Sequence, residues 1–326
     1  TISVASGLQK GGASVDVLEK EQIFSSTEFV VQSVAYLGSL QNLYTAELAI
    51  LSSSGEGSSP QAITPTQITN NSQIFKIVPL NNVRTSIKNF DDEKITKIIP
   101  FTASNGTEFL LMAAQTSGKI IRLDPVTQIA KDIVTGLDQP SSLVIDTSTG
   151  NLLVAEQNQV MIISKVLLES DLLTSQTPGS SGLQTIVLPL GGDGLARDRC
   201  TGDIYTTDTQ AGVIRRLDAR TQQVSIVFSG LQGPGQLLAL YRSGISCPHS
   251  LQLLLVEAGL ARLTLLTPAQ DLLAPWVVDI NSTDVAFLPG ASPFSSTSAI
   301  LLSELFDAEQ PQQGEGGSGL SVVGVP

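Results

Sequence analysis

An internal repeat constrains the fold of this chain more than any other feature of its sequence. Residues 111–127 (LMAAQTSGKIIRLDPVT) and 205–221 (YTTDTQAGVIRRLDART) lie 94 residues apart and share six of 17 positions, including the turn glycines Gly118 and Gly212. The apolar stretch before the glycine occurs six times, and the copies end at Glu47, Ala114, Glu156, Asp208, Glu257 and Glu304. Their successive spacings are 67, 42, 52, 49 and 47 residues. Repeats of about 40–50 residues are typical of propeller blades.

Each copy of the repeat predicts four short strands. The first strands are apolar runs at residues 33–37, 97–101, 143–146, 194–197, 237–241 and 285–288. A turn leads to the strand that ends in the acidic residue, and a glycine turn leads to a third strand, as at 119–123 and 213–217. A weaker fourth strand follows, as at 224–228. Short apolar runs bounded by Gly, Ser, Asp and Pro are typical of strands. We therefore expect an all-β fold, a six-bladed β-propeller of four-stranded blades in a single domain, residues 1–326.

The last copy ends after its third strand, at residues 320–325. An N-terminal segment, either 2–5 or 15–18, is therefore expected to complete the last blade and close the ring, because closure removes exposed sheet edges. The segment 166–173 is the only short helical pattern that we expect.

Composition excludes several classes of function. Eighteen Lys and Arg stand against 30 Asp and Glu, so the net charge is −12, which argues against nucleic acid and against an anionic membrane as partners. One histidine and two cysteines are too few for a structural zinc site within one chain. The sequence contains no nucleophile elbow, no P-loop and no dinucleotide-binding fingerprint. No catalytic motif therefore identifies a reaction.

The acidic residues that end the second strands are expected to surround one face of the propeller. They are Glu47, Glu156, Asp208, Glu257 and Glu304, and Phe306 follows the last of them, where its ring could stack on a flat ligand. The functional interpretation is a mouth that binds a substrate. The alternative is that each carboxylate accepts N–H hydrogen bonds within its own turn, because buried acceptors are normally satisfied.

The starts of the innermost strands are expected to line the central channel at the same face. These positions hold mostly neutral polar groups: Gln32, Thr96, Ser142, Asp193, Gln236 and Asp284. They suit hydrogen bonds to a small ligand, and the alternative is that they line a channel filled with water. Two long loops, 52–71 and 307–319, are expected beside this mouth. They are interpreted either as a lid or as ordinary flexible loops.

Cys200 and Cys247 fall in the first-to-second-strand turns of neighbouring blades, on the face opposite the carboxylates. We predict a disulfide between them, with two free thiols as the alternative. A disulfide implies an oxidising compartment and a secreted or secretory-pathway protein. Three glycosylation sequons, at Asn70, Asn105 and Asn281, lie in predicted loops and agree with that route.

Two segments carry a resemblance to a known family. Residues 142–156 (SLVIDTSTGNLLVAE) and 194–208 (GLARDRCTGDIYTTD) resemble the NHL-repeat and gluconolactonase-like propellers. The resemblance implies one divalent cation, Ca or Zn, at the centre of one face, with Glu28 and Asp193 as ligands, and the hydrolysis of lactones or esters. A serine stands where that family has an asparagine ligand, so the ligand set is incomplete for a hard cation.

The overall character of the chain, with low charge, an apolar interior and no nucleophile, is also similar to that of fungal propellers that include hetero-Diels–Alder cyclases. That resemblance implies a small hydrophobic metabolite, no cofactor, and cyclisation by templating. Orienting two reactants can contribute about 7–11 kcal/mol at its limit, and a donor on a carbonyl adds electrostatic stabilisation. Gln32, Ser142, Asp193 and Gln236 are the predicted catalytic residues. Lactone hydrolysis and a non-enzymatic extracellular binding module are the alternatives.

Overall fold

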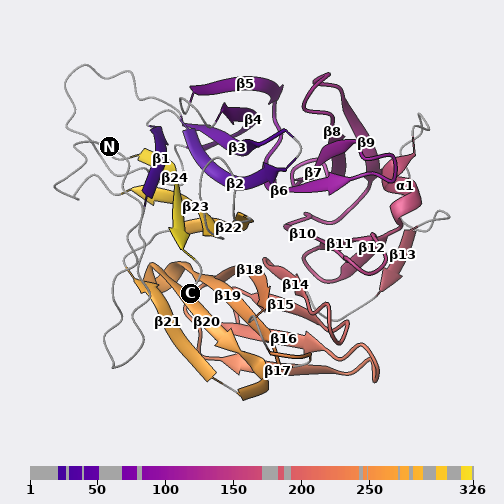
Figure 1. Ribbon diagram of the computed structural model, residues 1–326, viewed down its shortest axis with the longest axis vertical. Coiled ribbons are helices and arrows are strands. Elements are labelled where there is room, and N and C mark those ends of the chain that lie inside the picture. The colour runs from indigo at the N-terminus through magenta and orange to yellow at the C-terminus, as the bar shows by residue number, and fades with distance from the viewer. Residues whose placement is uncertain are drawn as a thin grey trace. The chain divides into compact units, whose positions relative to one another are not determined.

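The computed structural model is built almost wholly of antiparallel strands (Figure 1). It describes residues 21–26, 29–38, 40–50, 68–78, 83–170, 183–186, 192–241, 245–247, 249–270, 272–278, 282–288, 299–306 and 317–324. The chain divides into two compact units, residues 1–95 with 280–326, and residues 96–279.

The first unit contains two four-stranded sheets. One has the order β2 (Phe29–Leu37), β3 (Asn42–Ile50), β4 (Ile68–Val78) and β5 (Val83–Phe90). The other has the order β1 (Glu21–Ser26), β24 (Gly317–Gly324), β23 (Ala299–Phe306) and β22 (Ser282–Leu288). β1 pairs antiparallel with β24, so an N-terminal strand completes a C-terminal sheet, as predicted. The strand that does so is 21–26, not 2–5 or 15–18, which lie outside the described residues.

The second unit contains four sheets, each made of consecutive strands. The first is β6 (Ile95–Thr102), β7 (Glu108–Ala114), β8 (Lys119–Leu123) and β9 (Ala130–Thr135). The second is β10 (Ser142–Ile145), β11 (Leu152–Ala155), β12 (Val160–Ile163) and β13 (Leu183–Ile186). The third is β14 (Leu195–Arg197), β15 (Ile204–Asp208), β16 (Val213–Leu217) and β17 (Val224–Ser229). The fourth is β18 (Pro234–Tyr241), β19 (Leu251–Glu257), β20 (Arg262–Thr267) and β21 (Leu272–Val278).

An all-β propeller with four-stranded blades is thus confirmed, with five blades of consecutive strands where the sequence predicts six blades. The remaining four-stranded sheet is composite and combines β1 with β22, β23 and β24. The predicted third strands 119–123 and 213–217 match β8 and β16. The helix is shorter than expected: α1 spans Lys165–Glu169.

The cores lie between neighbouring sheets, where the apolar faces of the strands meet. Leu111 and Ile120 of one sheet belong to the same buried cluster as Leu143, Leu152 and Met161 of the next. Burial of such faces is the main favourable term in folding. It also explains why β7 and β11 are nearly continuous apolar runs, since most of their residues are buried.

The repeated glycines have a shared structural reason. Gly118 and Gly212 have φ values of +63° and +64°. A Cβ at either position would lie 2.2 or 2.5 Å from a carbonyl oxygen, that of Leu137 or Leu231. The same two leucines donate their N–H groups to the glycine carbonyls at 3.0 Å. The glycine therefore fastens the turn after the second strand to the segment that leads into the next blade.

The two long loops fall mostly outside the described residues. Residues 68–71 of the first expected loop belong to β4, and residues 317–319 of the second belong to β24. Both loops are therefore shorter than predicted, because strand pairing extends into them. Among the described residues, no helix has the length and apolar character that a membrane span requires.

Candidate functional site

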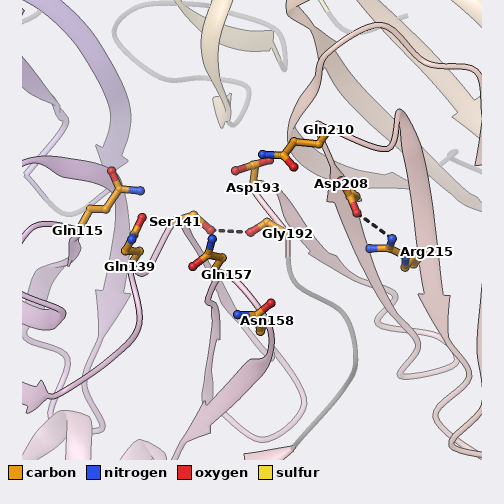
Figure 2. Close-up of a pocket in the computed structure, with 10 residues that line it drawn as sticks. All are labelled: Gln115, Gln139, Ser141, Gln157, Asn158, Gly192, Asp193, Asp208, Gln210 and Arg215. Atoms are coloured by element: carbon orange, nitrogen blue, oxygen red, sulfur yellow. Dashed lines mark hydrogen bonds and ion pairs between the residues drawn. The ribbon is translucent and has the colours of Figure 1, made fainter.

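A pocket of about 710 Å³ lies in the second unit (Figure 2). Its lining is polar and consists of Gln115, Gln139, Ser141, Gln157, Asn158, Gly192, Asp193, Asp208, Gln210 and Arg215. Most of these residues come from the turns after the second strands and from the connections between blades in three neighbouring sheets, whereas Asp208 ends β15 and Arg215 lies in β16. That is the face on which the sequence predicts a mouth.

Five carboxamides dominate the lining, and sequence reasoning missed all of them. Gln115, Gln157 and Gln210 follow the recurring second-strand end at Ala114, Glu156 and Asp208 by one or two residues. That regular position was a signal available in the sequence. Gln139 instead lies in the connection from β9 to β10 and has a φ of +50°, which no repeat pattern indicates.

An ion pair joins Asp208 and Arg215 in the pocket wall. The Nη2 group of Arg215 donates to Oδ2 of Asp208 at 2.7 Å (Figure 2). The N–H of Ala211 donates to Oδ1 of Asp208 at 2.8 Å. Burial acts to raise the pKa of Asp208, but these donors outweigh it and hold the pKa below its ordinary value. Asp208 is therefore ionised and paired at neutral pH.

Asp193 is the most exposed acidic group of the lining. Its Oδ2 accepts hydrogen bonds from the Thr209 hydroxyl and from the Thr209 N–H, the latter at 3.3 Å. Its Oδ1 accepts no hydrogen bond from any residue that the structure describes. Of the predicted catalytic residues, Asp193 alone lines the pocket.

Ser142 and Gln236, two of the predicted catalytic residues, bind each other. The Ser142 hydroxyl donates to Oε1 of Gln236 at 2.9 Å, and Nε2 of Gln236 donates to the Asp193 carbonyl at 2.9 Å. Ser142 is buried. These side chains therefore join the starts of three first strands, and their hydrogen-bonding capacity serves the scaffold.

Other hydroxyls join neighbouring blades in the same way. The hydroxyl of Thr96 donates to the Pro140 carbonyl at 3.0 Å, and that of Ser141 donates to the Gly192 carbonyl at 2.7 Å. Thr207 donates to the Gly235 carbonyl at 2.8 Å. Thr96, predicted to bind substrate, thus lies at a junction between blades.

The acidic residues that end the second strands are held within the fold. Oε2 of Glu156 accepts from the N–H of Asp138, and Oε1 of Glu257 accepts from that of Gln232, both at 2.9 Å. The alternative interpretation of the sequence placed the N–H donors within each residue's own turn, whereas here they lie 18 and 25 residues earlier in the chain. Each carboxylate holds the connection that enters its own blade.

Arginines pair with two of the buried acids. Glu47 pairs with Arg84, and Glu257 pairs with Arg262. Burial raises the pKa of Glu47, and the Arg84 guanidinium and the Thr45 hydroxyl oppose that rise only in part. Burial also acts to raise the pKa of Glu257, but the Arg262 guanidinium, the Gln232 N–H and the Thr264 hydroxyl lower it below its ordinary value.

The remaining predicted site residues belong to the first unit. Asp284 is buried and accepts from the Ser33 hydroxyl at 2.6 Å and from the Val34 N–H at 3.2 Å. Gln32 is half-buried and lies at an irregularity in the β2–β3 pairing. Glu304 and Phe306 lie in β23, and nothing of their side chains is described. Glu28 lies outside the described residues.

The described residues do not fit the divalent site that the family resemblance implies. No group of three or more His, Cys, Asp or Glu side chains comes together among them. In the pocket, Asp208 is committed to Arg215, which leaves Asp193 as the available carboxylate. A hard cation takes about six to eight oxygen ligands, several of them carboxylates.

The predicted disulfide is confirmed. Cys200 and Cys247 are bonded, with their Cα atoms 5.5 Å apart. Cys200 follows β14 and Cys247 precedes β19, so the bond joins two neighbouring sheets. Asn70 and Asn105 of the predicted sequons are exposed, and Asn281 lies outside the described residues.

Solved structures with a similar fold were found, although no protein-family profile and no curated protein sequence matches the chain. A luciferin-regenerating enzyme has a TM-score of 0.60 at 14% identity, over 94% of this chain and 96% of that one. A catalytically inactive virginiamycin B lyase from Staphylococcus aureus with quinupristin has a TM-score of 0.53 at 11% identity, over 95% and 99%. A chain of a nidogen/laminin complex has a TM-score of 0.53 at 13% identity, over 77% and 95%. At these identities the likeness shows the propeller fold alone.

Proposed function

We propose that this chain is a propeller enzyme that binds a small, oxygen-rich organic molecule in the amide-lined pocket and orients it for reaction. The pocket itself carries the proposal. Its volume, about 710 Å³, lies within the range of about 300–1,000 Å³ that is typical of small-molecule sites. Five carboxamides in one lining favour a ligand with several hydrogen-bonding groups.

Carboxamides determine which ligands suit the pocket. Each presents an NH₂ donor and a carbonyl acceptor, so together they match carbonyl, hydroxyl and ether oxygens. A polar lining departs from the expectation of a small hydrophobic metabolite, and the proposed ligand is polar for that reason. Scaffold propellers that bind other proteins need no such recess, which favours an enzyme over a binding module.

Templated cyclisation of the hetero-Diels–Alder type is the reaction that we propose for this site. Three π bonds are converted in one step into two new σ bonds and one new π bond, so no proton, electron or cofactor has to be supplied. The protein orients the two reactants and places an amide N–H on the carbonyl oxygen, where negative charge develops. Gln115, Gln139 and Gln157 take this role in place of Ser142 and Gln236, which bind each other.

Stereoselective product formation tests the function. The purified full chain would be incubated with an o-quinone-methide heterodiene that carries hydroxyl groups and with an alkene partner. Chiral chromatography should show one enantiomer in excess with the native chain, and Gln115→Leu and Gln157→Leu should lower the excess. Gln232→Leu, an exposed position outside the lining, is the matched control. Racemic product in every case would show that the pocket does not template this reaction.

We also propose a secretory route for this chain. The Cys200–Cys247 disulfide supports it, because disulfides persist in oxidising compartments. Asn105 is the proposed glycan acceptor, since it is exposed in a turn and a side chain at the following Gly106 would meet nothing within 4 Å. Peptide mass mapping of chain recovered from the medium of a eukaryotic host should find a glycan on Asn105, and an unmodified peptide would contradict the assignment.

A further inference from the structure

The charged groups around the pocket do not balance. We propose that the pocket selects a ligand that carries a protonated amine, and that Asp193 binds this ammonium group. The inference rests on the proposed function, because it names the chemistry of the ligand in the same pocket. It depends on three features of the described residues: one neutralised ion pair, one available carboxylate, and one buried carboxylate without a cation.

The ion pair removes the positive charge of the lining. Arg215 is the only Lys or Arg in the described lining, and its guanidinium is bonded to Asp208 at 2.7 Å. Both side chains are about three-quarters buried, with exposed fractions of 24% and 26%. An anionic ligand would have to compete with Asp208 for the guanidinium. The pair therefore offers little to a carboxylate ligand and adds no net charge.

Asp193 offers a carboxylate oxygen to the ligand. Its exposed carboxylate binds Thr209 through Oδ2, and Oδ1 has no donor among the described residues. Charge-assisted hydrogen bonds to a carboxylate are about twice as strong as neutral ones. An ammonium group has three donors, so it could bond Oδ1 and the carbonyl oxygens of nearby carboxamides together.

Glu156 adds a second carboxylate that no cation balances. Its side chain is 1% exposed, and Oε2 accepts from the Asp138 N–H and from Nε2 of Gln159, at 2.9 and 3.1 Å. Oε1 is buried without a hydrogen-bond partner. Among the described residues Glu156 has no ion pair, whereas the comparable acids of three other sheets each have an arginine: Glu47 with Arg84, Asp208 with Arg215 and Glu257 with Arg262.

The position of Glu156 links this charge to the pocket. Gln157 and Asn158, the next two residues, line the pocket. The main-chain carbonyl of Glu156 accepts a hydrogen bond from the N–H of Gly192, another lining residue, at 3.3 Å. A concave site with one sign of charge concentrates oppositely charged ligands, and low-dielectric walls strengthen the effect. The pocket should therefore prefer an amine to a neutral compound of equal size, and a neutral compound to a carboxylate.

Three pyranoses of similar size and different charge test the inference. D-glucosamine is cationic, N-acetyl-D-glucosamine is neutral and D-glucuronate is anionic. Binding to the full chain would be followed by chemical-shift changes of the Gln and Asn side-chain amides. We expect glucosamine to bind most tightly and glucuronate least. Asp193→Asn keeps the shape of the side chain. It should lower the affinity for glucosamine roughly tenfold and leave the affinity for N-acetylglucosamine unchanged.

Matched variants separate charge from structure. Gln159→Arg places a guanidinium beside Glu156, as Arg262 lies beside Glu257. It should lower the affinity for glucosamine and not the affinity for the other two sugars. Asp132→Asn removes a surface carboxylate that pairs with Lys119 outside the lining and should change nothing.

The outcomes distinguish this inference from the proposed function. Equal affinity for glucosamine and N-acetylglucosamine, unchanged in Asp193→Asn, would overturn the amine preference and leave the pocket as a site for neutral ligands. Tighter binding of glucuronate would also overturn it. No shift of any pocket amide with any probe at about 10 mM would overturn both proposals.

Discussion

Equivalent residues in two copies of the repeat make the same local hydrogen bonds. Asp124 and Asp218 occupy equivalent positions, and Oδ1 of each accepts from the two N–H groups found two and three residues later. These donors hold the pKa of both carboxyls below the ordinary value against the effect of burial.

Replacement of a repeat glycine should be costly. Gly212→Ala combines a φ of +64° with a Cβ only 2.5 Å from the Leu231 carbonyl. We expect a loss of about 3 kcal/mol or more in the free energy of unfolding, measured by urea denaturation. Gly230→Ala is the control in the same sheet, because its φ is +78° but nothing lies within 4 Å of its Cβ. It should lose about 1–2 kcal/mol. Equal losses would show that the close approach is unimportant.

Two buried glutamates should respond to pH in opposite directions. The pKa of Glu257 is lowered by folding, so its contribution to stability is present at neutral pH and is lost as the pH falls through the folded pKa. The pKa of Glu47 is raised by burial, so its contribution is fully present in acid and is lost as the pH rises through the folded pKa.

Urea unfolding between about pH 3 and pH 7 would measure both effects. The stability difference between the native chain and Glu257→Gln should grow with pH, and that between the native chain and Glu47→Gln should shrink. Parallel slopes for the two variants would contradict the assignment of the two shifts.

At the scale of elements, short polar bridges hold the blades of the second unit together. Gln236 joins β10 and β14 to its own strand β18 through Ser142 and the Asp193 carbonyl.

Gln236→Leu leaves the buried Ser142 hydroxyl without its acceptor, so we expect a loss of about 2–3 kcal/mol in unfolding free energy. The control is Gln232→Leu, because the hydrogen bond that Gln232 makes to Glu257 comes from its main chain. Similar losses in both variants would count against the bridge.

The disulfide is the covalent link between two neighbouring sheets. Cys200 and Cys247 are separated by 47 residues, for which loop closure predicts a stabilisation of about 4 kcal/mol. The Cys200→Ala/Cys247→Ala double variant should melt at a lower temperature than the native chain, and a reductant should lower only the melting temperature of the native chain. A native chain insensitive to reduction would show that the bond adds no stability.

At the scale of the whole molecule, strands from the N-terminal and C-terminal parts of the chain pair within the first unit. β1 pairs with β24, and β2 contacts β22 through the hydrogen bonds from Ser33 and Val34 to Asp284. The hydrogen bonds from β2 to Asp284 span 251 and 250 residues of sequence. Closing such long loops is costly in entropy, and folds dominated by non-local contacts fold slowly.

Removal of β1 tests this arrangement. A chain that begins at residue 27 leaves the β24 edge without its partner, and unpaired edges promote association between chains. Light scattering should show a growing population of oligomers, and the melting temperature should fall. A monomer of unchanged melting temperature would show that β1 contributes little to the sheet.

Much of the fold followed from the sequence, because strand and turn signals are local. The glycine turn of Gly118 and Gly212 predicted β8 and β16 to the residue. Two cysteines placed in neighbouring turns predicted a bond that the structure confirms. The strand that completes the last sheet was misplaced, since pairing with β24 depends on long-range register and not on local pattern.

The sequence predicted which face of the propeller carries the candidate site, but not the side chains that line it. The repeat alone determined that turns after second strands and connections between blades meet, because that follows from chain order and strand direction. Which side chains remain free for a ligand was decided by tertiary contacts. Ser142 and Gln236 bind each other across blades, and Asp208 is held by Arg215, whereas the carboxamides are left to line the pocket. The Ser142–Gln236 bond joins residues 94 apart in sequence, which no local pattern encodes, whereas the Asp208–Arg215 pair spans only seven residues within one hairpin.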